Sequence, residues 1–477
     1  MPRRTRQHQL ELRLPAEVGV VNIGLPVFGD AVRAQGAAAV DVDWRIPAGG
    51  HPELVAALER LYGPVSDRVE TANREVVRRL DEAVPVLVGI APAAEVVPGM
   101  GARTVLHCGP PLDWEAFCDP LRRSVRASVV AERWASSPEE AERLVASGRV
   151  ALEPANHHAA VVPMATSLAP SAPVFVVENR QGGNRAYSGL NQGPRATAWF
   201  GMDSPAAVER LTWLRDAAAP VLGAALAATG PIELFPLVAQ GLQMGDDVHM
   251  RTQATTNLLV RHLLPQLVAV DSPRLVEVAR FLSGNHLFFL NLAMAAAKAV
   301  ADWAARVPDS SVVTGMARNG TTFGIRLAGT GDTWFVAPAP PVGNALYYPG
   351  FGPDASAPDI GDSAVLELVG LGGPAAAASP AVAAFLGGTM ADAVATTEAM
   401  DRICAGRSGR FKLPLLDFRG TPIGVDVRKA VELGITPSIN TGILHAGAGT
   451  GQVGAGIAQA PIECFRRALL ALDVRLQ

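Results

Sequence analysis

The chain has 477 residues, of which 49% are apolar and 18% are charged. That balance excludes an intrinsically disordered protein, and the length is sufficient for several hydrophobic cores. The 41 basic and 45 acidic residues nearly cancel, to a net charge of −4. No strong field therefore favours nucleic acid or an anionic membrane as the partner, and we expect a small polar ligand.

The four cysteines and the apolar stretches narrow the class of protein further. The cysteines are too few for a disulfide framework and lack the spacing of a zinc site, so we expect a reducing, cytoplasmic compartment and no metal. The most apolar stretches, 217–230 and 287–305, are short or carry polar residues such as Lys298 and Asp302. No segment is expected to span a membrane.

The first 204 residues alternate between short apolar runs and helical patterns. Residues 1–50 contain an apolar run, an amphipathic stretch and a second apolar run, which predicts a βαβ-like segment. Residues 51–100 have helical periodicity and are expected to form a helical connector. Residues 101–204 return to short apolar runs between Pro and Gly turns, which is typical of an α/β domain.

The rest of the chain changes pattern once more. Helical periodicity runs throughout 205–309 and predicts a helical subdomain, whereas 310–477 combines short strands with a Gly-rich loop and a C-terminal helix. The predicted fold class is therefore mixed α/β (α+β) and multidomain, with short-strand α/β regions flanking a central helical subdomain.

Polar clusters follow several of the apolar runs, where α/β proteins place their binding loops. His157 and His158 are adjacent, so one strand cannot direct both at a single metal; His158 is a structural histidine, an acid/base or a ligand. Asn179, Asn184 and Arg185 supply amide and guanidinium donors that suit a carboxylate or a planar amide. The alternative for this second cluster is an ordinary surface turn.

Two further clusters lie in the second half. The segment 244–251, MGDDVHMR, interrupts an apolar helical pattern with charge, which favours a functional role for His249 and Arg251; the alternative is a simple surface pair of Asp247 with Arg251. Arg318 and Asn319 precede an alternating strand, and hairpin turn chemistry explains them equally well.

The glycines Gly449, Gly451 and Gly454 match the pattern GxGxxG. A dinucleotide site needs a second strand with an acidic residue about 20 positions later, and the chain ends first, so no nucleotide cofactor is expected. Bare backbone N–H groups before a helix would still suit phosphate or another small anion. Close backbone packing is the alternative.

Taken together, the motifs resemble a bacterial family of which one branch is a subunit of the three-component oxamate carbamoyltransferase of anaerobic allantoin breakdown. The resemblance covers about residues 84–473 and is carried by the following motifs in this order: HCGPPLDW at 107–114, VVENRQGGNRAY at 176–187, MGDDVHMR at 244–251, MARNGTTFGIRLAG at 316–329, PDIGDS at 358–363 and GITPSINTGILHAGAGTGQVGAG at 434–456.

The resemblance implies transfer of a carbamoyl group between carbamoyl phosphate and a small amide such as oxamate, in a heteromeric complex. Residues 20–50 are similar to the closing segment of a synthetase-like partner subunit, which implies that the two subunits touch. A further small subunit and a homo- or hetero-oligomer are expected. Thr252 stands where several relatives carry Asn, so the amide substrate can differ.

The implied chemistry assigns roles that bring all the clusters into one cleft. The phosphate and the carboxylate need cationic or backbone partners, and the amide must lose a proton. The expected anion contacts are Arg185, Arg251, Arg318 and the loop of Gly449, Gly451 and Gly454. The expected amide or oxyanion contacts are Asn179, Asn184 and Asn319, with His249 or His158 as the proton carrier.

Two other classes of function remain open from the sequence. The chain can be a non-catalytic assembly or ligand-binding subunit of a synthetase-like complex. It can also be an acyl or phosphoryl transferase that acts with CoA or a nucleotide through its partner.

Overall fold

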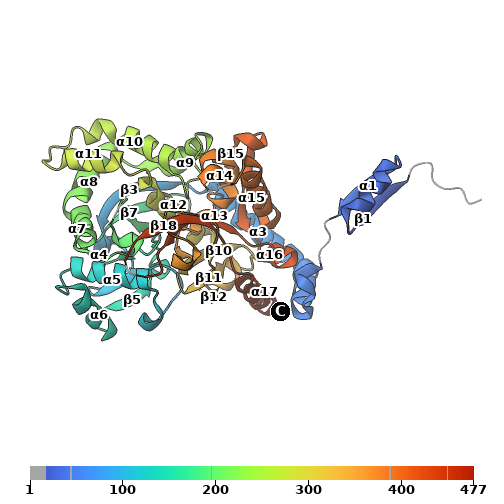
Figure 1. Ribbon diagram of the computed structural model, residues 1–477, viewed down its shortest axis with the longest axis horizontal. Helices are drawn as coiled ribbons and strands as arrows, with labels where there is room; N and C mark the ends of the chain where they lie inside the picture. The colour runs from blue at the N-terminus through green and yellow to red at the C-terminus, as the bar shows by residue number, and fades with distance from the viewer. Residues whose placement is uncertain (1–17, 43–45, 195, 386–387, 448) are drawn as a thin grey trace, which may run out of the picture.

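The structure, a computed structural model, describes residues 18–42, 46–194, 196–385, 388–447 and 449–477. Near the N-terminus, strand β1 (Gly19–Ile23), helix α1 (Pro26–Ala34) and strand β2 (Ala38–Val42) form a βαβ unit with two parallel strands. Figure 1 shows this unit to one side of the other elements. Helices α2 (Pro52–Tyr62) and α3 (Ser66–Glu82) follow.

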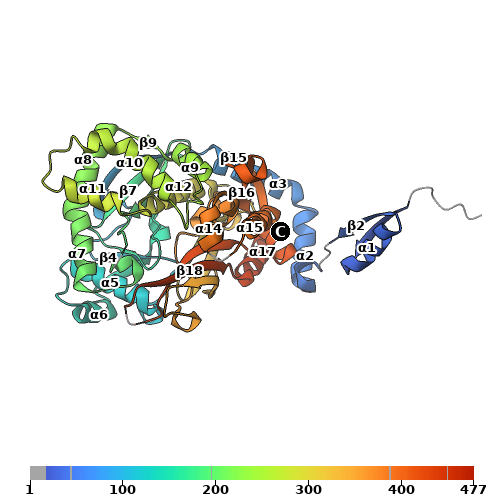
Figure 2. The same cartoon turned by 45° about the horizontal axis from the view of Figure 1, so that its top comes forward.

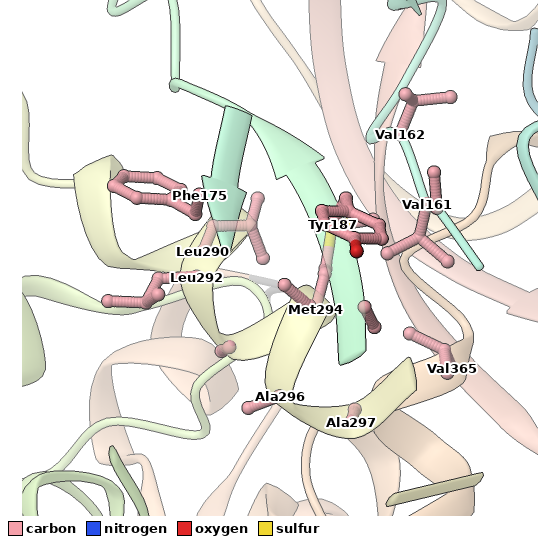
Figure 3. Packing of buried hydrophobic residues seen from close by; sticks show 14 of the residues in the cluster. Val161, Val162, Phe175, Tyr187, Leu290, Leu292, Met294, Ala296, Ala297 and Val365 are labelled. Atoms are coloured by element: carbon pink, nitrogen blue, oxygen red, sulfur yellow. The ribbon is translucent and has the colours of Figure 1, made fainter. Parts of the chain in front are cut away.

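The first large sheet has the order β8-β7-β3-β9, and its strands are antiparallel. Its strands are β3 (Pro85–Pro92), β7 (Pro173–Asn179), β8 (Asn184–Gly189) and β9 (Ile232–Glu233). Helix α12 (Phe288–Ala304) packs against it and is buried along almost its whole length, as expected of a helix inside the core. Figure 3 shows Met294 of this helix close to Tyr187 of β8.

A smaller sheet of order β5-β4-β6 lies beside helices α5 and α6. Its strands are β4 (Thr104–His107), β5 (Ala151–Pro154) and β6 (Ser167–Leu168), and the two helices are α5 (Asp119–Ala131) and α6 (Pro138–Ala146). The short helix α4 (Ala93–Val96) precedes β4 and contacts β3 and β7 of the first sheet. Strands β4 and β5 are parallel because α5 and α6 form the crossover between them.

The central helices cover this half of the molecule (Figure 1). They are α7 (Pro205–Trp213), α8 (Ala219–Thr229), α9 (Leu234–Gln243), α10 (Gln253–Leu267) and α11 (Leu275–Ser283). Within the described ranges, no single helix has the length and apolarity to cross a membrane; α11 and α12, bent by 79° from one another, pass that test only as a pair.

The C-terminal half holds three more sheets, of orders β12-β11-β10-β14, β13-β18-β17 and β15-β16. Their strands are β10 (Val313–Asn319), β11 (Thr322–Leu327), β12 (Phe335–Pro338), β13 (Val342–Tyr347), β14 (Ile360–Gly361), β15 (Cys404–Leu413), β16 (Arg419–Val425), β17 (Ser438–Leu444) and β18 (Gln452–Gln459). The helices are α13 (Val365–Leu368), α14 (Pro380–Phe385), α15 (Met390–Ile403), α16 (Val427–Leu433) and α17 (Ile462–Leu476). Helices α2, α16 and α17 enclose a second core with β10 and β11.

This arrangement confirms the mixed α/β class with several small sheets. Two local predictions were wrong. Residues 85–92, expected within a helical connector, form β3, the strand that joins β7 to β9. The Gly-rich stretch expected to lead directly into a helix instead forms the turn and second strand of the β17–β18 hairpin, and α17 begins only at Ile462.

Candidate functional site

A cleft of about 580 Å³ opens between the central helices and the β17–β18 hairpin. We call it the main cleft; it is lined by Gly193, Pro194, Ala196, Trp199, Phe200, Met202, Met250, Arg251, Asn285, His286, Leu287, Tyr348, Val382, Thr450, Gly451, Gln452 and Ala455. A narrow space of about 50 Å³, the inner pocket, shares Trp199, Phe200, Met250, Leu287 and Gln452 with it and also reaches His249, Ser363, Asn440 and Thr441. The two spaces are therefore neighbours that share part of their lining.

Two consecutive buried aspartates fold the loop that carries the polar residues of the site. The loop joins α9 to α10. Asp246 accepts hydrogen bonds from the backbone N–H groups of Ala254 and Thr255 and so caps α10, although burial raises the pKa of Asp246. Asp247 accepts hydrogen bonds from the backbone N–H groups of Met250 and Arg251. The two aspartates that interrupt the apolar pattern in the sequence therefore hold the backbone of this loop in place.

His249 enters the inner pocket from this loop and is oriented by a buried carboxylate. Its Nδ1 lies 2.7 Å from Oε1 of Glu367, which is 0% exposed. A carboxylate only accepts, so Nδ1 is the nitrogen that carries the hydrogen in this contact, and Nε2 has the lone pair in that tautomer. The close approach needs glycine at Gly372, where a Cβ would lie 2.1 Å from Glu367 Oε1. The arrangement is that of an oriented acid/base histidine.

Arg251 lines the main cleft one residue beyond Met250. Its Nε lies 3.3 Å from Oδ1 of Asp246, and its side chain is 35% exposed. Its terminal Nη groups make no hydrogen bond within the described ranges, so they can bind an anion in the cleft. His249 and Arg251 therefore lie at two neighbouring spaces, the inner pocket and the main cleft.

The Gly-rich loop reaches the cleft only in part. Gly451 lies in the turn between β17 and β18 with φ +92°, and it lines the main cleft together with Thr450. Gly449 lies in the same turn with φ +58°. Gly454 is inside β18, where a Cβ would lie 2.6 Å from the carbonyl oxygen of Leu346. Because the turn joins two strands, the helix N-terminus that was expected to bind phosphate is absent at this loop.

Arg318 does not face the cleft, contrary to expectation. It is fully buried, and its five N–H groups are all used: two on Asp359, one on the carbonyl of Gly361, one on Ser363 and one on Thr441. A guanidinium without a free N–H cannot bind a substrate anion. Since Ser363 and Thr441 line the inner pocket, Arg318 holds the wall of that pocket from behind.

Asn319 is also buried, and its carboxamide closes the turn between β10 and β11. Its Oδ1 accepts the N–H groups of Thr321 and Thr322, and its Nδ2 donates to the carbonyl of Pro110. Asn319 therefore has the structural role in a hairpin turn that was the alternative to a substrate contact.

The cluster at 179–185 lies in the β7–β8 hairpin and lines neither space. Asn184 donates to the carbonyl of Ala299, and Asn179 accepts the N–H of Val84, so both amides tie the hairpin to its neighbours. Arg185 pairs with Glu178 on the surface. The expected convergence of these three residues with His249 is wrong.

His158 lies outside the cleft as well. Its Nδ1 lies 2.7 Å from the carbonyl oxygen of Pro98, and its Nε2 lies 2.7 Å from Oε2 of Glu153. Both ring nitrogens are therefore engaged, which matches the structural alternative rather than proton transfer at the cleft.

Several polar residues of the site were missed by sequence reasoning. Glu367, Asn440 and Thr441 are buried around His249, and Asn285 and Gln452 line the main cleft. The signal for Glu367 was a lone carboxylate inside the apolar run AVLELVG, and the signal for Asn440 was an amide inside SINTGIL. Buried polar residues in apolar strands and helices usually have a partner or a ligand.

The fold and the site define the class: a mixed α/β protein with a buried histidine–carboxylate pair beside a cleft between two halves. Residues 150–363 match the family described as "Oxamate carbamoyltransferase subunit AllG". The chain is 41% identical to the oxamate carbamoyltransferase subunit AllG of Escherichia coli, over 85% of this chain and 97% of the relative. It is 37% identical to the uncharacterized protein YahG of the same organism, over 95% and 96%.

A solved structure is similar as well. It is a conserved protein of unknown function from Enterococcus faecalis, 37% identical, with a TM-score of 0.85 over 87% of this chain and 99% of that chain. The chain therefore belongs to the AllG family, and the resemblance inferred from its motifs is confirmed.

Proposed function

We propose that this chain is a carbamoyltransferase subunit that moves a carbamoyl group between carbamoyl phosphate and a small amide such as oxamate. The observation that carries the proposal is that the His249–Glu367 pair and Arg251 lie at two neighbouring spaces with shared lining residues, in a member of the AllG family. That family name supports a role in a heteromeric complex, and we propose a synthetase-like subunit and a further small subunit as the partners.

In the proposed reaction, the amide nitrogen of oxamate attacks the carbamoyl carbon, and the bond from that carbon to the phosphate oxygen breaks. Phosphate leaves with the electron pair, the nitrogen loses one proton, and the products are oxalurate and phosphate. In the reverse reaction, phosphate attacks the carbamoyl carbon of oxalurate, and the bond from that carbon to the oxamate nitrogen breaks. The nitrogen takes up one proton, and the products are oxamate and carbamoyl phosphate. Nε2 of His249 takes the proton because Glu367 holds Nδ1–H.

Arg251 supplies the anion contact at the outer end of this space. Its free Nη groups suit a phosphate or a carboxylate, and the backbone at Thr450 and Gly451 lines the same wall. We propose that the anionic part of the substrate lies there, with Gly449 and Gly451 shaping the turn. The neutral amide end then points into the inner pocket, where His249 lies.

The test is an assay of the chain coexpressed with its synthetase-like partner and supplied with carbamoyl phosphate and oxamate. We expect release of phosphate and formation of oxalurate, and loss of both in His249→Asn with an unchanged melting temperature. The matched control is His158→Asn, since His158 also pairs with a glutamate but lies outside the cleft.

Other outcomes would reassign the chain. Turnover that persists in His249→Asn would favour a non-catalytic assembly or ligand-binding subunit. Turnover that requires CoA or a nucleotide would favour an acyl or phosphoryl transferase.

A further inference from the structure

Asn440 stands on β17 between two cavities. It lines the inner pocket and also a side cavity of about 420 Å³, whose other walls come mainly from α14, α15 and β18. Figure 2 shows α14 and α15 beside β18. The side chain is 1% exposed, so every polar atom of its amide needs a partner from the protein or from a ligand.

The orientation of the Asn440 amide is fixed by a carboxylate. Its Nδ2 donates to Oδ2 of Asp247 at 2.6 Å, and Asp247 in turn accepts the N–H groups of Met250 and Arg251. A flipped amide would place its carbonyl oxygen against the carboxylate, which repels it. Oδ1 therefore points away from Asp247. The same contact ties β17 to the loop that carries His249.

Oδ1 of Asn440 is buried and accepts no hydrogen bond within the described ranges. Glu367 Oε2, the carboxylate oxygen that does not face His249, is also buried and unpaired there. The backbone N–H of Asn440 lies 3.4 Å from Oε1 of Glu367. Two unpaired acceptors therefore occur next to the acid/base histidine, and a buried acceptor without a donor is unfavourable.

We propose that Asn440 Oδ1 accepts an N–H of a primary carboxamide of the substrate and so selects a –NH2 group at the His249 end of the site. This inference rests on the proposed function and adds the residue that recognises the amide. A –NH2 group has two hydrogens: one hydrogen is bound by Asn440, and the other faces Nε2 of His249, which removes it where the group is the attacking –NH2 of oxamate. A methyl group in the same place leaves Oδ1 unpaired and is rejected for that reason.

Oxamate and carbamoyl phosphate both contain a –NH2 group. A comparison of each compound with an isostere that carries methyl instead shows which of the two amides is recognised. Pyruvate replaces the –NH2 of oxamate by methyl, and acetyl phosphate does the same for carbamoyl phosphate. The experiment is calorimetric titration of the chain, coexpressed with its partner, with these four compounds. The variants are Asn440→Ala and Asn440→Ser. The control is Gln459→Ala, whose amide bonds Ser438 on the same sheet outside both cavities.

We expect the wild-type protein to bind the carboxamide of one pair about 10- to 100-fold more tightly than its methyl isostere, and the pair concerned identifies which amide is recognised. In both Asn440 variants the ratio should fall towards one, whereas Gln459→Ala should keep it. The wild-type ratios need no variant and remain informative if a variant fails to fold. Equal binding within both pairs, or a ratio kept in a folded Asn440 variant, overturns the inference.

Failure of the proposed function gives a different result. A complex without carbamoyl transfer that still prefers carboxamides through Asn440 refutes the reaction and supports the ligand class. A complex that turns over oxamate without any Asn440-dependent preference keeps the reaction and refutes the role of Asn440. A complex that binds none of the four compounds refutes both.

Discussion

His249 and His158 each lie 2.7 Å from a glutamate oxygen, yet only His249 keeps a ring nitrogen for chemistry. His158 uses Nε2 on Glu153 and Nδ1 on a backbone carbonyl. His249 uses Nδ1 on Glu367 and lines the inner pocket. The two similar pairs thus distinguish a structural histidine, His158, from the proposed proton carrier, His249, and substitutions in the two pairs can be compared directly.

The first prediction concerns the carboxylate behind His249. Glu367→Gln keeps the volume but can present an N–H to Nδ1, which moves the ring hydrogen to Nε2 and removes the base. We expect kcat for carbamoyl transfer to fall on the order of 100-fold or more with little change in KM. Glu153→Gln is the control, and we expect it to leave kcat unchanged. Equal losses in both variants would contradict a special role for Glu367.

The second prediction compares two arginines that the sequence treated alike. Arg251→Ala removes a charge-assisted contact in the main cleft, so KM for the anionic substrate should rise about 10- to 100-fold. Arg185→Ala removes only a surface pair with Glu178 and should leave KM unchanged. Steady-state kinetics of the complex measure both. A larger rise of KM in Arg185→Ala than in Arg251→Ala would contradict this assignment and would support Arg185 as the anion contact expected from the sequence.

The third prediction concerns stability. Arg318→Ala leaves Asp359 as a buried charge without its partner, because both side chains are 0% exposed. We expect the free energy of unfolding to fall by about 3–5 kcal/mol. Arg180→Ala breaks a pair with Glu233 in which both side chains are 50% exposed, and should cost less than about 1 kcal/mol. Urea unfolding followed by circular dichroism compares the two, and similar midpoints would contradict the assignment.

The fourth prediction concerns pH. Burial raises the pKa of Asp362 to about 7, against the opposing effect of the N–H groups of Gly109 and Val162. The folded state therefore holds a proton that the unfolded state, with a pKa of about 3.9, releases. Stability from this group is present at low pH and is lost as pH rises towards 7.

The measurement for Asp362 is a difference between proteins, because His107, whose pKa burial lowers to about 4, contributes the opposite slope over part of the same range. Asp362→Asn keeps His107, so the difference in unfolding free energy isolates the aspartate. We expect wild type to lose stability relative to Asp362→Asn between pH 4 and pH 7. A constant difference across that range would show that the carboxyl is ionised throughout.

Much of the fold could be predicted from local pattern. Apolar periodicity indicated the central helices and the mixed α/β class, and the run from β1 to β2 had the expected order. Strand β3 was missed because its residues follow a long amphipathic helix and its two partners, β7 and β9, come about 80 and 140 residues later. Pairing at that distance leaves no mark on the local sequence.

The site could be predicted only where the chain breaks its own pattern. The loop 244–251 was found because charge interrupts an apolar helix. The remaining candidates failed because arginine and asparagine also serve as internal structural partners: Arg318 and Asn319 satisfy backbone and side-chain groups that no sequence pattern reveals. Glu367 was missed because it is a single polar residue in an apolar run, and Asn440 because it lies beside Thr441 in a short strand with nothing to mark its amide as special.

The walls of the main cleft come from segments as far apart as Gly193 and Ala455. Neither the helical portion nor the C-terminal hairpin alone can enclose a ligand, so a fragment of this chain that folds has only half a binding surface. We therefore expect the capacity to bind a ligand in this cleft to return late in refolding, after helical circular dichroism has recovered, because it requires the two portions to dock.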